Sequence, residues 1–297
     1  MQKPNFLIIG LARSGTTSMY HYLRQHPNIF LPSIKEPKFF SGRNIQYPHN
    51  GKGDKIVDDL RILNEQEYYS LFDSSNGEKA IGEASSDYFY HIKECYKDIL
   101  SELGNETKII ICLRDPYERS FSAYNNLIRD SRETLSFSEG LLQEDYRIGN
   151  NYDWMWHYLE GSLYHDKLKL ILENFHDVHL VFFEDIKNNI DDTLKNICKF
   201  LCVDQSFSFR TETKYSRSGK PKNTIIKIIS RRYGIFYKAR KVIMQILPRV
   251  ILERLSTSIF KKETINSDCI EILKPKLNND IDKLEDLLNI NFNHWKR

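Results

Sequence analysis

The clearest indication of the fold is the segment FLIIGLARSGTTSMYHYL, which begins at Phe6. Its apolar start predicts a buried strand over 5–9, and its second half has the pattern of a helix over 15–25. A glycine-bounded loop joins the two. Helix-start N–H groups lack partners within the helix, and the helix dipole favours negative charge there. The segment therefore predicts a binding site for a phosphate group.

The loop differs from that of an ATP-binding protein at one decisive position. The spacing from Gly10 to Gly15 matches a nucleoside-triphosphate P-loop, but Thr16 stands where the lysine of that motif belongs. The cation of the loop is instead Arg13. A loop with a guanidinium to one side and no lysine for a γ-phosphate indicates a nucleotide other than ATP.

The remaining pattern predicts an α/β fold. Further apolar runs predict buried strands over 79–82, 108–113 and 178–183, and helical periodicity covers 88–103, 116–129, 163–174 and 190–201. Strands that alternate with helices indicate a P-loop-like parallel β-sheet, of about five strands, flanked by helices. We expect a single domain over 1–297 with a polar excursion over 41–64, a basic helical C-terminal lid containing the segment 223–262, and a closing helix over 281–290.

The charges are distributed unevenly along the 297 residues. The net charge is only +3, which does not indicate nucleic-acid binding. The segment 210–262, however, holds fifteen Lys and Arg against two acidic residues, so the rest of the chain is net acidic. Such a segment predicts an anionic partner. Residues 224–262 are first expected to form a lid with solvated charges; peripheral contact with an anionic membrane and a channel for an acidic glycan are the alternatives.

Cysteine usage and hydropathy predict a cytoplasmic protein, with a location peripheral to the inner membrane face as the alternative. No stretch reaches the roughly 18 apolar residues of a membrane span, and no leader precedes the first strand. The cysteines are odd in number and form no CxxC pair, so we expect reduced, buried thiols. They are Cys95, Cys112, Cys198, Cys202 and Cys269.

A second anion site is predicted in the segment KIIICLRDPYERSFSAY over 108–124. Asp115 reads as the N-cap of a helix with Pro116 at its first position, which leaves Arg114 free at the carboxyl edge of the sheet. Ser122 falls on the same helix face as Asp115. An arginine and a hydroxyl together make a good phosphate clamp. The chain thus offers two phosphate sites and no evident metal-binding acid.

Two phosphates on one nucleotide without a metal describe 3′-phosphoadenosine 5′-phosphosulfate (PAPS), and the chain resembles the PAPS-dependent sulfotransferase family over most of its length. The RSGTTS loop is similar to the 5′-phosphosulfate loop, and the Arg114–Ser122 segment to the 3′-phosphate motif. KEPKFF over 35–40 resembles the heparan-sulfate-type carbohydrate branch, and IGEASSDY over 81–88 resembles bacterial members. RSGKP over 217–221 and the tail that ends near Trp295 resemble later family features.

The resemblance implies roles for the loop residues. The Ser14 and Gly15 amides, the Thr16 and Thr17 hydroxyls, and Ser18 would hold the 5′-phosphate. Arg13 would lie against the bridging oxygen. Many relatives have a lysine there, and an arginine can stabilise the leaving group's charge but cannot protonate it at neutral pH.

The resemblance also implies a 3′-phosphate site and a general base. Arg114 and Ser122 would bind the 3′-phosphate, under a cationic loop that contributes Arg217, Gly219 and Lys220. Glu36 would be the base, kept ionised by the flanking Lys35 and Lys38 and extended by Pro37. His91, His157 and His165 are the alternative bases.

The implied reaction moves a sulfuryl group from PAPS to an acceptor hydroxyl on a saccharide or glycolipid, leaving the 3′,5′-bisphosphate (PAP), without a metal. A P-loop nucleotide kinase, or a glycan-binding or membrane-surface module without catalysis, are the competing interpretations.

In the aromatic cluster over 152–158, Trp154 and Trp156 cannot share a helix face, so we expect one of them to be exposed.

Overall fold

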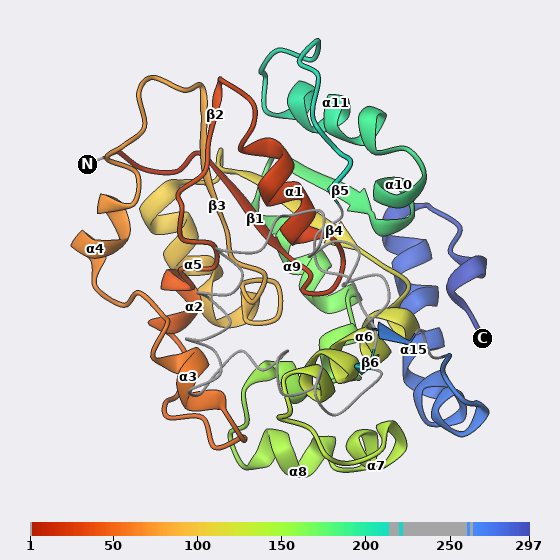
Figure 1. Ribbon diagram of the computed structural model, residues 1–297. Coiled ribbons are helices and arrows are strands. Elements are labelled where there is room, and N and C mark those ends of the chain that lie inside the picture. Colours follow the sequence, from red (N-terminus) through yellow and green to blue (C-terminus); the bar gives the residue numbers. More distant parts are fainter. Residues whose placement is uncertain (1, 214–219, 222–259, 262–263) are drawn as a thin grey trace.

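The structure is a computed structural model that describes residues 2–213, 220–221, 260–261 and 264–297. Its centre is a parallel sheet in the order β2-β3-β1-β4-β5 (Figure 1). The strands are β1 (Phe6–Gly10), β2 (Ile29–Phe30), β3 (Ala80–Ala84), β4 (Lys108–Leu113) and β5 (Val178–Phe182). The predicted α/β class and parallel sheet are confirmed.

Helices cover both faces of this sheet (Figure 1). In chain order they are α1 (Thr16–Leu23), α2 (Phe39–Gly42), α3 (Asp54–Asp58), α4 (Glu65–Ser70), α5 (Ile92–Leu103), α6 (Pro116–Arg129), α7 (Phe137–Leu142), α8 (Glu144–Gly149), α9 (His165–Asn174), α10 (Phe183–Asn188), α11 (Ile190–Phe200) and α15 (Ser267–Leu288). Short 3-10 helices occur at η1 (Trp154–Trp156), η2 (Glu160–Ser162) and η3 (Asn293–Trp295).

Alternating side chains of the strands divide the core in two. Phe6 and Ile8 pack with residues of α1 and α11, whereas Leu7 and Ile9 pack with residues of α5, α6, α9 and α15. All four side chains are fully buried. A strand that is covered on both faces must be apolar throughout, which is why the sequence of β1 shows no alternation with polar residues.

The order of the strands brings the predicted sites together. The central strand β1 pairs with β3 on one side and with β4 on the other. Because parallel strands end at the same edge, the segments that follow these three strands meet there. Those segments are the phosphate-binding loop, the Arg114 region and residues 85–88.

Several details differ from the predictions. Strand β2 was not predicted, and α15 begins well before the expected 281. Cys202 is exposed, against our expectation for all cysteines, because it follows the end of α11 at the surface; the other four thiols are buried. Within the described part of the chain, no helix is long and apolar enough to cross a membrane.

The predicted basic lid is described only in part. Phe260–Lys261 form strand β7, which pairs antiparallel with β6 (Lys220–Pro221), so these two residues are strand rather than helix. Strand β6 lies against α6. The rest of the basic segment 223–262 lies outside the described residues.

Candidate active site

The loop after β1 has a conformation that requires glycine. Gly15 precedes α1 with φ 98°, in the left-handed region. A Cβ at this position would lie 2.7 Å from Cδ1 of Ile186. Glycine therefore lets the backbone turn into α1 and lets α10 pack closely against the loop.

The donors of this loop fit a phosphate group. Among the described residues no side chain caps the start of α1, so the helix-start N–H groups at Thr16, Thr17 and Ser18 are available to an anion. The Ser14 hydroxyl is fully buried and has no hydrogen-bond partner among these residues. One expectation fails, because the Ser14 N–H donates to the Leu11 carbonyl at 3.1 Å. Ser14 therefore offers its hydroxyl rather than its amide.

Arg13 joins the two predicted phosphate sites. Its Nε donates to Ser122 Oγ on α6 at 3.1 Å, and its carbonyl oxygen accepts from Arg114 Nη1 at 3.0 Å. The backbone of Arg13 has φ 75°, a conformation that non-glycine residues adopt only when surrounding contacts hold it. The two arginines and Ser122 thus form one junction at the carboxyl edge of the sheet.

Arg114 is a largely buried cation whose charge is only partly balanced by a nearby acidic group. Its side chain is 11% exposed and contacts Glu118 Oε2 at 3.3 Å, while its guanidinium lies over the ring of Phe183 at 4.6 Å. Burial lowers the pKa of Arg114, although an arginine stays charged at neutral pH. Among the described residues its ion-pair partner is the half-exposed Glu118 carboxylate, so this buried guanidinium is well placed to bind an additional anion.

The acid beside Arg114 is engaged by the fold, as predicted. Asp115 caps α6 by accepting from the N–H groups of Tyr117 and Glu118, and Pro116 occupies the first helical position. Its second oxygen binds Arg297 at 2.5 Å. Asp115 is therefore a capping residue.

Glu36 lies near the end of β3 and is held by several contacts. Its N–H donates to the Ala84 carbonyl at 2.9 Å, and its Oε1 accepts from Ser86 Oγ at 3.0 Å. The φ of Glu36 is 61°, so the expected extended conformation is wrong. The bond to Ala84 and another from Ile62 N–H to the Pro37 carbonyl hold the turn against the usual preference of a residue before proline.

The electrostatics of Glu36 are dominated by two lysines. Lys35 Nζ lies 2.5 Å from Oε1, and Lys38 Nζ lies 4.0 Å from Oε2. Burial raises the pKa of Glu36, but Lys35 and Lys38, with the hydrogen bond from Ser86, lower it to about 2. The side chain remains 31% exposed, so an incoming group can reach it. Glu36 is therefore an accessible carboxylate at neutral pH.

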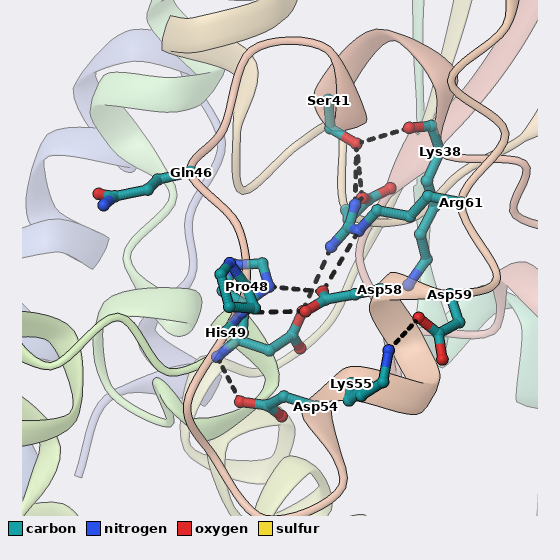
Figure 2. Close-up of polar contacts among 12 residues, drawn as sticks. Lys38, Ser41, Gln46, Pro48, His49, Asp54, Lys55, Asp58, Asp59 and Arg61 are labelled. Atoms are coloured by element: carbon teal, nitrogen blue, oxygen red, sulfur yellow. Dashed lines mark hydrogen bonds and ion pairs between the residues drawn. The ribbon is translucent and has the colours of Figure 1, made fainter.

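One cluster of described residues has the spacing of a metal site. His49, Asp58 and Asp153 each place a ligand atom within 4.8 Å of the others. A guanidinium already provides the positive charge, because Arg61 lies 3.3 Å from Asp153. Arg61 also lies 3.9 Å from Asp58, and both of these side chains are labelled in Figure 2. His49 Nδ1 is also bound to Asp58 at 2.6 Å. We interpret the cluster as a buried ion-pair network that holds the 41–64 segment in place.

Two of the three alternative histidine bases have other partners. His157 Nδ1 lies 2.6 Å from the Tyr90 hydroxyl, and His165 Nδ1 lies 2.8 Å from Asp166. Burial lowers the pKa of His91 and of His157 to about 4, so both are neutral at physiological pH.

The aromatic cluster is more deeply buried than predicted. Trp154 and Trp156 are each only 3% exposed, so the expectation of one exposed tryptophan is wrong. Both tryptophans lie in the 3-10 helix η1, and neighbouring residues bury both side chains. Trp156 Nε1 donates to Asp54 at 2.9 Å, and Trp154 packs beside Tyr90.

The predicted covering loop is described only in part, and one contact of the site was not predicted. Arg217 and Gly219 lie outside the described residues, and Lys220 is in β6 beside α6. Ser86, which binds Glu36, was not predicted as a site residue. Its place just after a predicted strand, in the quoted segment 81–88, was the signal that could have identified it.

Comparisons with known proteins identify the family and the fold. The sulfotransferase domain model matches residues 3–226. A crystal structure of a sulfotransferase from Alicyclobacillus acidocaldarius superposes over 100% of both chains with a TM-score of 0.79 and 30% sequence identity.

Two curated relatives match over shorter regions. The membrane-associated sulfotransferase kil1 of Dictyostelium discoideum is 33% identical over 147 residues, which is 48% of this chain and 28% of that protein. Carbohydrate sulfotransferase 15 of Mus musculus is 28% identical over 164 residues, 46% of this chain and 29% of that protein. The chain thus matches less than a third of the length of either relative.

Proposed function

The chain belongs to the sulfotransferase domain family, and we propose that it transfers a sulfuryl group from PAPS to an acceptor hydroxyl, leaving PAP. The observation that carries the proposal is the junction of Arg13, Ser122 and Arg114, which links a helix-start anion site to a second cationic site. A nucleotide with phosphates at both its 3′ and 5′ positions has the charges that this pair of sites requires.

In this proposal the loop after β1 holds the 5′-phosphate. The donors are the N–H groups of residues 15–18, the hydroxyls of Thr16, Thr17 and Ser18, and the buried Ser14 hydroxyl. Arg114 and Ser122 hold the 3′-phosphate, and the proposed covering loop contributes Arg217, Gly219 and Lys220. The position of β6 beside α6 supports that placement of the loop.

Glu36 and Arg13 carry the chemistry. The acceptor oxygen attacks sulfur in line, the bond from sulfur to the bridging phosphate oxygen breaks, and Glu36 takes the hydroxyl proton. Arg13 stabilises the negative charge that develops on the departing 5′-phosphate. Because β3 pairs with β1 at Ile8 and Ala84, and Glu36 binds the Ala84 carbonyl, the base lies at the same sheet edge as the loop.

The acceptor, the location and the extent of the domain are further parts of the proposal. The name of carbohydrate sulfotransferase 15 supports a saccharide as the acceptor, with a glycolipid as an alternative. A cytoplasmic location, peripheral contact of residues 224–262 with an anionic membrane, and a single domain over 1–297 stay predictions. The proposed reaction uses no metal.

Calorimetric titration with PAP, AMP and ATP, each with and without a chelator, tests the nucleotide assignment. Arg114→Ala should weaken binding of PAP at least about tenfold more than binding of AMP, because only PAP carries the 3′-phosphate. Lys169→Ala, on the exposed surface of α9, is the matched control. Equal losses for PAP and AMP would argue against the 3′ site. Magnesium-dependent binding of ATP would favour a kinase, and absence of PAP binding would favour a module without catalysis.

A further inference from the structure

We propose that Glu83, a buried carboxylate of β3, positions the turn that carries the general base through the hydroxyls of Ser85 and Tyr88. The inference rests on the proposed function, because its catalytic effect is exerted through Glu36. Glu83 would not touch the substrates, so it is a positioning residue.

The first connection runs through Ser85. The Lys38 N–H donates to Ser85 Oγ at 3.1 Å, and Ser85 Oγ donates to Glu83 Oε2 at 2.7 Å. Glu83 and Ser85 are both fully buried. Since the serine hydroxyl has one proton and gives it to Glu83, its lone pairs face the Lys38 amide.

The second connection runs through Tyr88. The Phe40 N–H donates to the Tyr88 hydroxyl at 3.3 Å, and that hydroxyl interacts with the Glu83 carboxylate, whose pKa it lowers. Two backbone donors of one turn are thus held by two hydroxyls that share one carboxylate. Tyr68 adds a long contact to the same carboxylate at 3.4 Å.

These bonds act where the backbone most needs support. Lys38 precedes α2 in the left-handed conformation, with φ 57° and ψ 32°, and no side chain of its own caps the helix. The start of α2 leaves N–H groups without helical partners, and Ser85 and Tyr88 satisfy two of them. Glu36, two residues earlier, is also left-handed, so a shift of Lys38 would move both the Glu36 carboxylate and the ammonium beside it.

An ionised Glu83 is needed for both connections. A carboxylate accepts at both oxygens and so favours hydroxyls that point their protons towards it, whereas a carboxylic acid must use one oxygen as a donor. Burial raises the pKa of Glu83 to about 7; the charge of Asp87 adds to the rise, and hydrogen bonds from Tyr88, Ser85 and Tyr68 oppose it. Asp87 is itself paired with Arg61 at 2.9 Å. The support of the turn should therefore weaken below neutral pH.

The direct test is Glu83→Gln, which keeps the size of the side chain and removes its charge. We expect kcat for sulfuryl transfer to fall about ten- to a hundredfold, while PAP affinity stays within about twofold of wild type because the nucleotide site is untouched. Wild type should lose activity on the acid side of neutrality, and this loss should disappear in the variant. Equal losses of kcat and PAP affinity, or an unchanged kcat, would overturn the proposal.

Glu139→Gln is the matched control. Glu139 also accepts a serine hydroxyl, from Ser136 at 2.6 Å, but it lies exposed at the start of α7. Its replacement should leave kcat and the pH profile unchanged. If Glu83→Gln does not fold, Tyr88→Phe carries the test, because it removes one hydroxyl and keeps the ring. It should lower kcat without changing PAP affinity, and an unchanged kcat would contradict the proposal.

A readout that does not need the reaction separates this inference from the proposed function. Titration of Glu36 by carboxyl carbon NMR should show a pKa of about 2 in wild type and a clearly higher pKa in Glu83→Gln, because the two lysines would then lie farther from the carboxylate. A raised value would support the positioning role even in a protein that transfers no sulfuryl group. An unchanged value in an active enzyme would overturn the positioning role and leave the proposed function standing.

Discussion

Replacing Lys35 with methionine would remove the charge nearest to the Glu36 carboxylate and keep most of the side-chain volume. The two charged atoms are 2.5 Å apart. At that separation Coulomb's law gives about 2 to 7 kcal/mol for effective dielectric constants between about 80 and 20. Lys38, at 4.0 Å, would remain as the weaker of the two cations.

The expected result is a large rise of the Glu36 pKa. The present value of about 2 lies below the ordinary 4.5, a depression equivalent to about 3 kcal/mol. Burial is the largest influence and raises the pKa, while Lys35 is the largest that lowers it. With Lys35 gone, we expect the pKa of Glu36 to return to the ordinary range of a glutamate or above it.

The sign of the stability effect follows from the same shift. The Glu36 pKa is lower in the folded protein, so the ion pair stabilises the fold above the unfolded pKa and loses this effect as the pH falls towards 2. Because Glu36 is 31% exposed, solvent screening should reduce the contribution to about 1 kcal/mol. Lys35→Met should therefore cost about that much at pH 7 and nothing at very low pH.

The assay is an NMR titration of the Glu36 carboxyl carbon, supported by urea unfolding at pH 7 and pH 3. Lys169→Met, which removes an exposed lysine of α9, is the control and should leave Glu36 unchanged. If the Glu36 pKa in Lys35→Met stays at about 2, Lys35 is not the cause of the low pKa, and the electrostatic reasoning about the base is refuted.

Three further outcomes are expected. Gly15→Ala should lower the free energy of unfolding by about 1 to 3 kcal/mol, because φ at this position is 98° and the new Cβ would press on Ile186. A variant as stable as wild type in urea unfolding would show that the loop can relax. Arg61→Met should cost about 3 to 5 kcal/mol, since it leaves Asp87 and its neighbours without their buried cation; a loss below about 1 kcal/mol in the same assay would count against a buried network. In wild type, part of the free energy of unfolding should be lost as the pH rises from 4.5 to about 7, because the folded protein holds the Glu83 proton more tightly than the unfolded chain does. Glu83→Gln should remove this pH dependence. Identical pH profiles of the free energy of unfolding in wild type and variant would exclude it.

The sheet was predictable because its strands are covered on both faces. Such strands appear as continuous apolar runs, and β4 has the predicted bounds. Helix α6 also has its predicted bounds, since Asp115 and Pro116 mark its start unambiguously. Strand β2 is only two residues long and leaves no such pattern. The early start of α15 was missed because Pro275 lies inside the helix and reads as a break.

The junction at the sheet edge followed partly from the sequence. Placing Arg114 and Ser122 near the first loop required only that β1 and β4 be neighbours, as they are. The direct contacts of Arg13 with both residues could not be predicted, because they depend on a left-handed backbone at Arg13. The left-handed Glu36 was likewise missed. Local preference favours an extended residue before Pro37, and only tertiary hydrogen bonds reverse it.

The bond from Arg114 to the Arg13 carbonyl has a consequence for nucleotide selection. The side chain assigned to one phosphate is fastened to the main chain beside the other, so the spacing between the two anchoring points belongs to the protein and not to its ligand. The protein should therefore select nucleotides by the distance between their two phosphates. A bisphosphate with its second phosphate on the 2′ carbon carries the same charge as the 3′ isomer, yet we expect it to bind less tightly because it does not match that length.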